Sequence, residues 1–592
     1  MIRAFGARKV REAEAPLLAA GVPLMERASG ALALAILRLL GGSYGRRALA
    51  LAGPGNNGGD ALFAAASLAR RGMGVAAVVA EGAHEAGLAA ARAAGCAVLD
   101  VADIHAVVRE AARADVWIDG ILGIGARGGL RGPFASLVER LEGWREGAAW
   151  LPKADRPAGA SSAPRTKRMA KGGREAGPLV VAVDVPSGIG TDDGAAPGPI
   201  LRADLTVTMG APKPGLFLDP ARRHAGRVET ADIGLGLSAA ALGLGASSAS
   251  SASGAAGCAA HDVAGVDCGL PSPDLVSIER ADLPLLWPVP GPSSHKYTRG
   301  VVGVIAGSAS YPGAGFLCVD AALAAGPGMV RYAGTLGSAV ISSCPEAVLG
   351  EGRVDAWVIG PGLDGEALAH AEPIVDRLRS EGWTAPVVLD AGALAWAERG
   401  MTPASVLTPH AGELAALFSR LGIEGSREGI AACPAAAAKL ASEATGATVA
   451  LKGPVDVVAS PGSPVYAQSG PAWRAVAGAG DVYAGLLGAL LAAGLEPAQA
   501  AAAAACVHGL ASENGPMRAS DIVRNVPAAV RAALAGGSEE ESGFRTPGGS
   551  VRAFGASDAS ASAFRMRKAR TRGRRRPVQT TEECAHAARE EL

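Results

Sequence analysis

The chain has 592 residues, too many for one ordinary hydrophobic core, so we expect at least two domains. Lysine and arginine together number 56, and so do aspartate and glutamate. This balance gives no reason to expect nucleic acid or a membrane surface as a partner. Alanine-rich stretches alternate with valine-rich runs, a composition typical of a soluble α/β protein.

No stretch of roughly 20 strongly apolar residues suggests a membrane span. The N-terminal sequence MIRAFGARKVREAEAPLLAA contains basic residues and lacks a continuous apolar core, so we expect no signal peptide. The eight cysteines are scattered, and no C-x-x-C pair occurs. We therefore expect reduced thiols in the cytoplasm rather than a disulfide framework or a zinc site.

The first half of the chain alternates helical and strand-like segments. Helices are expected within residues 11–40, and apolar strands are expected at residues 48–52, 75–79, 116–119, 179–185 and 205–208. This alternation predicts a doubly wound parallel sheet, in which ligands bind beyond the C-terminal ends of the strands.

A glycine-rich loop, GPGNNGGD at residues 53–60, runs from the first of these strands into a helix. Strand, glycine loop and helix together form the phosphate-binding arrangement of nucleotide folds, although this loop matches neither G-x-G-x-x-G nor a Walker motif. The side-chain oxygens of Asn56 and Asn57 suit a hard cation or a ligand amide. A purely structural tight turn is the alternative.

Polar side chains recur where other strands of this half end. Asp119 ends one strand, and Asp184 ends another that leads to Ser187. Together with Asn57 they are expected to meet in one crevice as a cation or polar-ligand site, although a single aspartate at a strand end would usually be a helix cap. Lys213 either closes this pocket or belongs to a simple turn.

Three segments depart from the α/β pattern. Residues 145–178 are polar, basic and aperiodic, which predicts a disordered surface insertion, with nucleic-acid binding as the alternative. Residues 237–273 are rich in Ser, Ala and Gly and predict a flexible linker. Residues 536–592 carry a basic cluster and predict a disordered tail. The expected domains are therefore 1–236 and 274–535.

The second half repeats the scheme of strands with glycine-rich exits, so a second open α/β sheet is expected. Its strands are expected at residues 301–305, 328–332, 357–359, 387–390 and 448–451, with a further strand beginning at Val406. His410 follows in a strand-to-helix loop, where it is either a ligand or an exposed residue beside a helix capped by Thr408. Lys452, beside a glycine, either faces phosphate or is simply solvated.

The segment 475–481, AVAGAGD, precedes an apolar helix. Glycines let a ligand approach the main chain, and the free N–H groups and dipole of the following helix favour phosphate. A carboxylate beside a bound anion is repelled by it, so Asp481 suggests a base. An N-cap is the alternative.

With these residues in view, the chain resembles the bifunctional NAD(P)H-hydrate repair enzymes over residues 5–235 and 275–530. The resemblance is carried by GPGNNGGD (53–60), DVPSG (184–188), HKYTRG (295–300), TPHAGE (408–413), LKGP (451–454) and AGAGD (477–481). It implies a Rossmann-like epimerase domain followed by a ribokinase-like, ADP-dependent dehydratase domain. It also implies small-molecule substrates and a homo-oligomer.

For the epimerase, the resemblance implies that the hydrated nucleotide is held by Asn56, Asn57, Gly58, Gly59, Asp60, Gly123, Ile124, Gly125, Ala126, Arg127, Gly128, Gly129 and Asp184. Asn57, Asp119 and Ser187 would bind K⁺. Asp184 would move a proton during inversion at C6, although ring chemistry merely guided by the site is an alternative.

For the dehydratase, the resemblance implies that the hydrate contacts Ala314, Gly362, His410 and Asp481. ADP would contact Lys452, Gly453, Pro454, Val455, Asp456 and Gly480, with Mg²⁺ on its phosphates. Phosphoryl transfer would activate the C6 hydroxyl of the S hydrate, and elimination of phosphate would restore NADH or NADPH. Asp481 would deprotonate that hydroxyl as it attacks.

The sequence departs from the family pattern in three places, the first of which is the insertion at 145–178, which interrupts the epimerase just before Asp184. Residues 390–394 read DAGAL, so Gly392 lacks the second aspartate usual in relatives. Pro327 stands where an alanine is expected and is predicted to disturb a helix end. Two other functions stay open from sequence: a ribokinase-like small-molecule kinase, and a non-catalytic nucleotide-binding scaffold.

Overall fold

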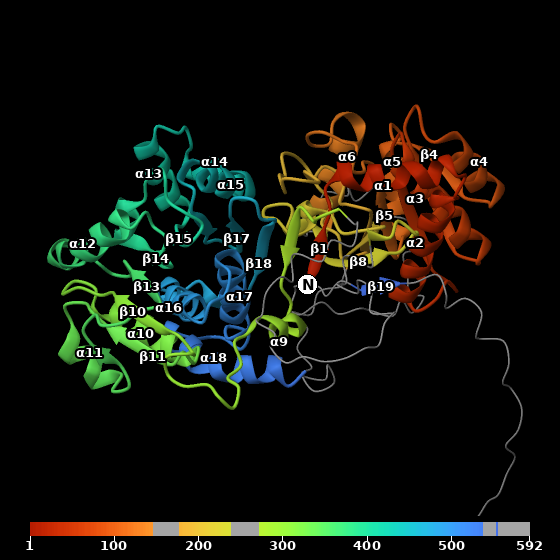
Figure 1. The fold of residues 1–592 in the computed structure, drawn as a ribbon. Coiled ribbons are helices and arrows are strands. Elements are labelled where there is room, and N and C mark those ends of the chain that lie inside the picture. The colour runs from red at the N-terminus through yellow and green to blue at the C-terminus, as the bar shows by residue number, and fades with distance from the viewer. Residues whose placement is uncertain (146–176, 238–270, 537–551, 555–592) are drawn as a thin grey trace, which may run out of the picture. The chain divides into compact units, whose positions relative to one another are not determined.

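The structure, a computed structural model, describes residues 1–145, 177–237, 271–536 and 552–554 (Figure 1). The strands in this part of the chain form one eight-stranded and one eleven-stranded sheet. The expectation of two open α/β sheets is confirmed. Most of the insertion, the linker and the tail expected from sequence lie outside the described residues.

The eight-stranded sheet is parallel throughout and has the order β19-β8-β7-β6-β5-β2-β3-β4. Its strands are β2 (Arg47–Ala52), β3 (Gly74–Val79), β4 (Ala97–Asp100), β5 (Val116–Gly120), β6 (Leu179–Val183), β7 (Leu205–Met209), β8 (Arg227–Ala231) and β19 (Arg552–Phe554). Its helices are α1 (Ala7–Ala19), α2 (Leu24–Leu40), α3 (Asn56–Arg70), α4 (Glu85–Ala93), α5 (Ile104–Arg113), α6 (Gly132–Arg145) and α7 (Arg222–Ala225), with the 3-10 turn η2 (Pro214–Leu216).

The eleven-stranded sheet has the order β1-β9-β18-β17-β16-β15-β14-β13-β10-β11-β12. Its strands are β1 (Ile2–Ala4), β9 (Leu275–Ser277), β10 (Val301–Ile305), β11 (Met329–Tyr332), β12 (Val348–Leu349), β13 (Ala356–Ile359), β14 (Val387–Leu389), β15 (Ser405–Leu407), β16 (Thr448–Leu451), β17 (Val455–Ala459) and β18 (Val465–Ser469). In the order of the sheet, the run from β16 through β15, β14, β13, β10 and β11 to β12 is parallel. The strand β17 runs antiparallel to both of its neighbours, β16 and β18.

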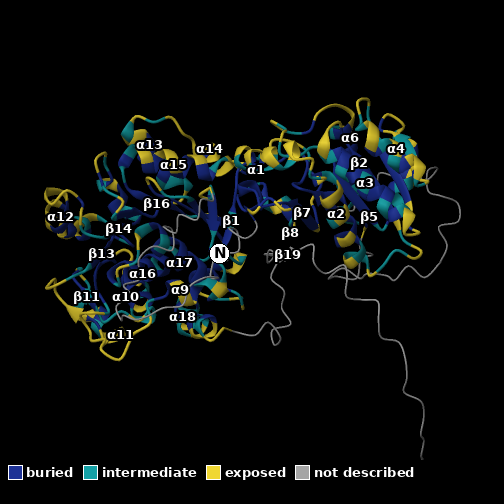
Figure 2. Ribbon diagram, turned by 45° about the vertical axis from the view of Figure 1, so that its right-hand side comes forward, coloured by how far each residue is buried: buried dark blue, intermediate teal, exposed yellow. Residues whose placement is uncertain are grey.

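The helices of the second half are α9 (Leu283–Leu286), α10 (Pro312–Ala324), α11 (Gly337–Ser343), α12 (Gly365–Ser380), α13 (Ala411–Leu421), α14 (Arg427–Ala432), α15 (Pro434–Thr445), α16 (Ala479–Ala492), α17 (Pro497–Leu510) and α18 (Ala519–Leu534), with the 3-10 helices η3 (Arg280–Asp282), η4 (Ala391–Trp396) and η5 (Ala472–Arg474). Figure 2 shows α16 and α17 as largely buried. Both are apolar on all sides, which is why they lie inside the domain rather than on its surface.

Each sheet has one point where the chain order reverses. In the first sheet β2 leads outward to β3 and β4, while β5 starts the run on the other side. In the second sheet β10 leads to β11 and β12, while β13 starts the opposite run. Ligands of open α/β sheets bind at such switch points, beyond the carboxyl ends of the strands. The loops after β2 and β5, and after β10 and β13, are therefore the places to look for sites.

The N-terminal strand crosses the expected domain boundary. β1 pairs with β9 at the edge of the eleven-stranded sheet, although residues 1–236 were expected to form the first domain alone. Gly6 N donates to Asp274 Oδ2 at 2.8 Å, and Lys9 Nζ lies 2.8 Å from Asp274 Oδ1. Residues 2–4 therefore complete the second sheet.

Two local predictions need correction. The strand expected at 179–185 ends at Val183, because Asp184 adopts a left-handed conformation (φ +65°). Within the expected tail, Arg552–Phe554 pair with β8 as β19.

Among the described residues, no single helix is long and apolar enough to cross a membrane, although the bent pair α1 and α2 passes the test of length and composition when taken together.

Candidate active sites

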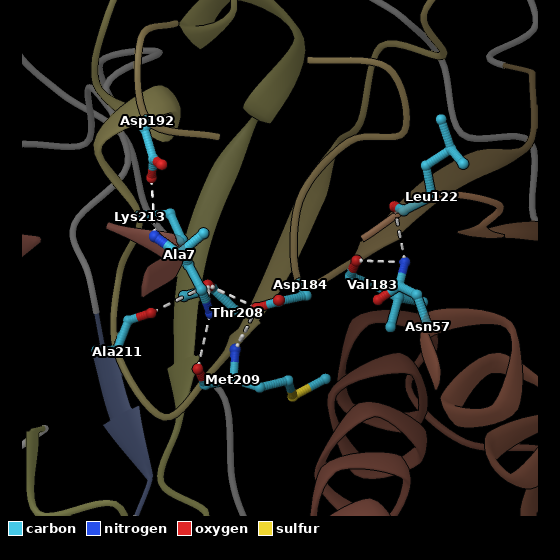
Figure 3. Close-up of polar contacts among 10 residues, drawn as sticks. All are labelled: Ala7, Asn57, Leu122, Val183, Asp184, Asp192, Thr208, Met209, Ala211 and Lys213. Carbon is cyan, nitrogen blue, oxygen red and sulfur yellow. Dashed lines mark hydrogen bonds and ion pairs between the residues drawn. The ribbon is translucent and has the colours of Figure 1, made fainter. Parts of the chain in front are cut away.

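Asn57, Asp119 and Ser187 meet at the switch point of the first sheet. Asn57 Nδ2 donates to the main-chain oxygens of Leu122 (2.9 Å) and Val183 (3.0 Å), as Figure 3 shows. Ser187 N donates to Asp119 Oδ2 at 2.9 Å, and Ser187 Oγ lies 2.8 Å from Leu122 N. The convergence predicted from three strand ends is confirmed. Asp119 is fully buried, and burial raises the pKa of its carboxyl group while hydrogen bonds from Ser187 lower it.

Asp184 and Lys213 form the charged centre of the same site. Asp184 Oδ1 accepts hydrogen bonds from Met209 N at 2.8 Å and Thr208 Oγ1 at 3.1 Å. The Lys213 ammonium group contacts the same oxygen and donates to Met209 O at 2.8 Å (Figure 3). Lys213 is fully buried and stands directly before the 3-10 turn η2, so it both contacts Asp184 and leads into a turn.

Asp60 is the fifth residue of α3 and lies near Asp184. Burial and the negative charges of Asp184 and Glu14 raise its pKa to about 8. Its buried Oδ1 has no hydrogen-bond partner among the described residues. At neutral pH the group is therefore protonated and has a proton to share with a ligand. Glu14 of α1, whose own pKa burial raises, carried no recognisable signal in the sequence.

The loop 123–129 runs beside Asn57. A Cβ atom at Gly123 would lie 3.1 Å from Asn57 Cβ, so the two segments are in close contact. Arg11 Nη2 donates to Ile124 O at 3.0 Å, which fixes the loop to α1. Arg127 is exposed. The segments expected to hold the substrate, residues 56–60 and 123–129, thus line neighbouring strand ends.

In the second half, Asp481 is the third residue of α16. Gly478, with φ +87°, is the N-cap residue, and no side chain caps the helix, so the alternative that Asp481 is an N-cap is wrong. Burial raises the pKa of Asp481 to about 6; the charge of Asp390 adds to this rise and that of Lys452 opposes it. A carboxyl group with this pKa is suited to accept a proton near neutral pH.

Lys452 lies against the same glycine loop. Its Nζ is 2.6 Å from Asp390 Oδ1, and it would be 3.4 Å from a Cβ atom at Gly480. Burial lowers the pKa of Lys452, but the negative charges of Asp390 and Glu413 outweigh this effect, so the pKa of Lys452 is raised. The alternative of a solvated lysine is wrong. Asp390 was assigned no role from sequence, although an aspartate ending a predicted strand is the same signal that singled out Asp184.

Residues 452–456 are tied to the segment before the glycine loop. Buried Arg474 of η5 forms an ion pair with Asp456, and its Nη2 donates to the main-chain oxygens of Gly453 (2.9 Å) and Pro454 (3.2 Å). Gly453 N donates to Asp456 Oδ1 at 3.1 Å. The Asp456 carboxylate is thus engaged within the protein, and Arg474 carried no signal in the sequence.

His410 caps α13. Its Nδ1 accepts hydrogen bonds from Gly412 N and Glu413 N, both at 3.1 Å, and Glu413 Oε2 accepts one from His410 N. The cap expected from Thr408 is therefore supplied by His410, whose side chain is 61% exposed. At the β10–β13 switch point, a Cβ atom at Gly362 would lie 2.5 Å from that of Ala314, which places these two residues side by side.

Two of the three departures from the family pattern lie in the described residues and can be examined locally. A Cβ atom at Gly392 would lie 2.5 Å from Leu363 O, so the main chain packs too closely here for any side chain without a shift. Pro327 follows Gly326 (φ +83°) and lies outside α10, which ends at Ala324. The predicted disturbance of the helix end by Pro327 is wrong.

Two family models match the chain, one in each half. Residues 21–215 match the family model described as YjeF-related protein N-terminus, and residues 302–527 match that described as NAD(P)H-hydrate dehydratase. The bifunctional NAD(P)H-hydrate repair enzyme of Mycobacterium tuberculosis is 39% identical over 514 residues, which cover 83% of this chain and 90% of that protein. The chain belongs to the bifunctional NAD(P)H-hydrate repair enzyme family.

Two further relatives match separate halves of this repair enzyme. The NAD(P)H-hydrate epimerase of Clavibacter michiganensis is 44% identical over 243 residues, covering 40% of this chain and 92% of that protein. A solved structure of the ADP/ATP-dependent NAD(P)H-hydrate dehydratase of Bacillus subtilis is 25% identical, with a TM-score of 0.38, covering 43% of this chain and 97% of that chain.

The family membership decides between the functions left open by the sequence. The chain is a bifunctional NAD(P)H-hydrate repair enzyme with an epimerase domain and a dehydratase domain. A small-molecule kinase and a non-catalytic scaffold are therefore not supported.

Proposed function

We propose that Asp481 is the base of the dehydratase site and that Asp184 is the acid–base residue of the epimerase site. The observation that carries the first assignment is the position of Asp481 in the first turn of α16, beside Lys452 and at the carboxyl ends of the strands. A base, a cation and free helix N–H groups at one point are what phosphoryl transfer to a hydroxyl requires.

The reaction proposed for the S hydrate has two steps. Asp481 accepts the proton of the C6 hydroxyl as its oxygen attacks the terminal phosphorus of ADP, and AMP leaves. Phosphate then departs from C6 as a neighbouring ring carbon loses a proton, which restores the ring double bond of NADH or NADPH. Hydroxide is a poor leaving group and phosphate a good one, so phosphorylation makes the elimination possible.

Lys452 and the main chain around Gly480 are proposed to hold the ADP phosphates. The ammonium group supplies positive charge, and the helix N-terminus supplies N–H donors. Among the described residues, no cluster of three metal-ligating side chains occurs. Mg²⁺ bound to the nucleotide phosphates would neutralise part of their charge.

The residues at the proposed K⁺ site of the epimerase are suited to binding this ion. The side chains of Asp119 and Ser187 and the carbonyl groups of Leu122 and Val183 are all oxygen donors, which hard cations prefer. Asn57 points its amide nitrogen at both carbonyls, and a half-turn of that amide would present its oxygen instead. Bound K⁺ would supply positive charge beside the fully buried Asp119 carboxylate.

In the epimerase site, Asp60 and Asp184 are proposed to donate and accept the protons that move at C6. Asp60 is protonated at neutral pH, whereas Asp184 is paired with Lys213. Inversion needs a donor to the departing C6 oxygen and an acceptor when it returns, and one neutral and one paired carboxyl group meet that need.

The free cysteines at positions 96, 318, 344, 433 and 506 support the expected cytoplasmic location. The homo-oligomer stays a prediction.

The test measures both activities on one protein. Purified protein with ADP and Mg²⁺ is expected to regenerate NADH absorbance from S hydrate, and Asp481→Asn is expected to abolish that signal while R and S hydrates still interconvert. Loss of epimerisation in the same variant would contradict the assignment. A phosphorylated product that accumulates without NADH would instead indicate a kinase.

A further inference from the structure

The dehydratase site contains a buried carboxylate that the proposed reaction does not use. Asp390 follows β14 and is 2% exposed. Its Oδ1 accepts from Lys452 Nζ at 2.6 Å and from Thr408 Oγ1 at 2.7 Å. A buried carboxylate is tolerated only with such partners, because removal from water without them is costly.

The main chain holds Asp390 firmly in place. Asp390 N donates to Ile359 O at 3.0 Å, and Asp390 O accepts from Ala393 N at 3.0 Å. The next residue, Ala391, has φ +45°, a left-handed conformation that L-residues adopt at a cost. A strained residue beside a buried carboxylate is typical of a functional position rather than a routine helix start.

Lys452 is held at a specific place by this carboxylate. Its main chain is anchored by the bond from Lys452 N to Pro409 O at 2.8 Å. Its side chain, if unpaired, would sample many rotamers, since lysine has a long and flexible stem. The bond to Asp390 keeps the ammonium group beside Gly480, in the first turn of α16.

We propose that Asp390 is a positioning residue of the dehydratase: it holds the Lys452 ammonium group at the phosphate end of the site and places a second negative charge beside the base. The inference rests on the proposed role of Asp481. It has two measurable consequences, one for nucleotide affinity and one for the pH at which the base works.

The pH consequence follows from the groups around Asp481. Burial raises its pKa, the charge of Asp390 raises it further and that of Lys452 lowers it. On α10, burial keeps the pKa of Cys318 well above its usual value, and on α17, burial lowers the pKa of His508 to about 3, so both are neutral near pH 6.

Two other charged groupings lie near α16. At the N-terminus of α18, the N-cap residue Arg518 pairs with Asp521 at 3.0 Å on the surface. Burial lowers the pKa of Lys452, and the negative charge of Glu413 on α13 is one of the effects that raise it. None of these groups replaces Asp390 as a second carboxylate beside the base.

The experiment compares Asp390→Asn with wild type across about pH 5 to 9, the range in which such a base titrates. The KM for ADP is expected to rise about tenfold, the factor that corresponds to the loss of one charged hydrogen bond. The acid limb of kcat/KM is expected to move to lower pH by about one unit, because a negative neighbour is lost and Lys452 is left unopposed. Lys452→Met should move that limb the opposite way.

Opposite shifts of the acid limb in Asp390→Asn and Lys452→Met would indicate a positioning role. A general loss of structure would lower turnover without moving the acid limb in opposite directions. Urea unfolding reports whether each variant folds. If Asp390→Asn does not fold, Thr408→Val removes only the hydroxyl that fixes Asp390 and is expected to raise the KM for ADP in the same direction by a smaller factor.

Unchanged KM for ADP and an unmoved acid limb in a folded Asp390→Asn protein would overturn the inference. A wild-type profile with no acid limb, or full turnover in Asp481→Asn, would instead overturn the proposed base, so the two failures are distinguishable.

Discussion

Lys213 and Asp184 form an ion pair in which the lysine side chain is fully buried and the aspartate side chain is 11% exposed. Thr208 Oγ1 lies 3.1 Å from both Lys213 Nζ and Asp184 Oδ1. A lysine is rarely fully buried unless it is paired, so each member of this pair depends on the other.

Removing one member of this pair should cost much stability. Asp184→Asn leaves the Lys213 ammonium group buried without its carboxylate, and the free energy of unfolding is expected to fall by about 3 to 5 kcal/mol. Urea unfolding measures the loss. The double variant Asp184→Asn with Lys213→Met should recover most of the stability but no epimerase activity. Recovery of activity in the double variant would contradict the role of Asp184.

Dehydratase activity should fall on the acid side with the titration of Asp481. Burial and the charge of Asp390 raise the pKa of Asp481 to about 6, and a base works only when deprotonated. We therefore expect kcat/KM for the S hydrate to be half-maximal near pH 6 and to fall below it. Full activity after the acid-treated samples are returned to neutral pH is the control for acid inactivation. A profile flat between about pH 5 and 8 would exclude Asp481 as the base.

Asp60 should make the protein less stable as pH rises. The unfolded chain loses this proton near the ordinary value of 3.8, whereas the folded chain keeps it to about 8. Between these values the folded state binds more protons, so the free energy of unfolding falls with increasing pH. Asp60→Asn keeps the neutral form, so its Tm should equal that of wild type near pH 4 and exceed it near pH 8. Parallel Tm curves would show that Asp60 is ionised when folded.

Arg474 should matter for ADP although it need not touch the nucleotide. Arg474→Met leaves the buried carboxylate of Asp456 unpaired and frees the carbonyl groups of Gly453 and Pro454. We expect a loss of about 3 to 5 kcal/mol in unfolding free energy and a raised KM for ADP. The matched control is Arg518→Met, because the Arg518 side chain is 74% exposed. Equal effects of the two variants would argue against a role for the contacts of Arg474 in ADP binding.

Gly392→Asp should not improve the enzyme, although it supplies the second aspartate that the family resemblance predicts. The new Cβ atom would lie 2.5 Å from Leu363 O, which forces the main chain apart. We expect a lower Tm and dehydratase activity no higher than that of wild type, measured by thermal unfolding and NADH regeneration. Higher activity would show that the absent aspartate limits this enzyme.

The sequence by itself determined the two α/β sheets, the parallel strands at their centres and the loops that carry chemistry. Alternating apolar runs and glycine-rich exits are local patterns, and the polar residues at strand ends must meet where parallel strands end. Asn57, Asp119, Asp184 and Ser187 were predicted to converge for this reason, and they do.

Only the tertiary structure decided which charges face one another. The pairs Lys213 with Asp184, Lys452 with Asp390 and Arg474 with Asp456 join residues 18 to 62 positions apart, and no local pattern encodes such contacts. The edge strand β1 was missed because three residues have no periodicity of their own and are held by pairing with β9. Burial, which is a property of the folded chain alone, then sets the pKa of Asp60 and Asp481 and so decides which carboxyl groups keep or accept a proton.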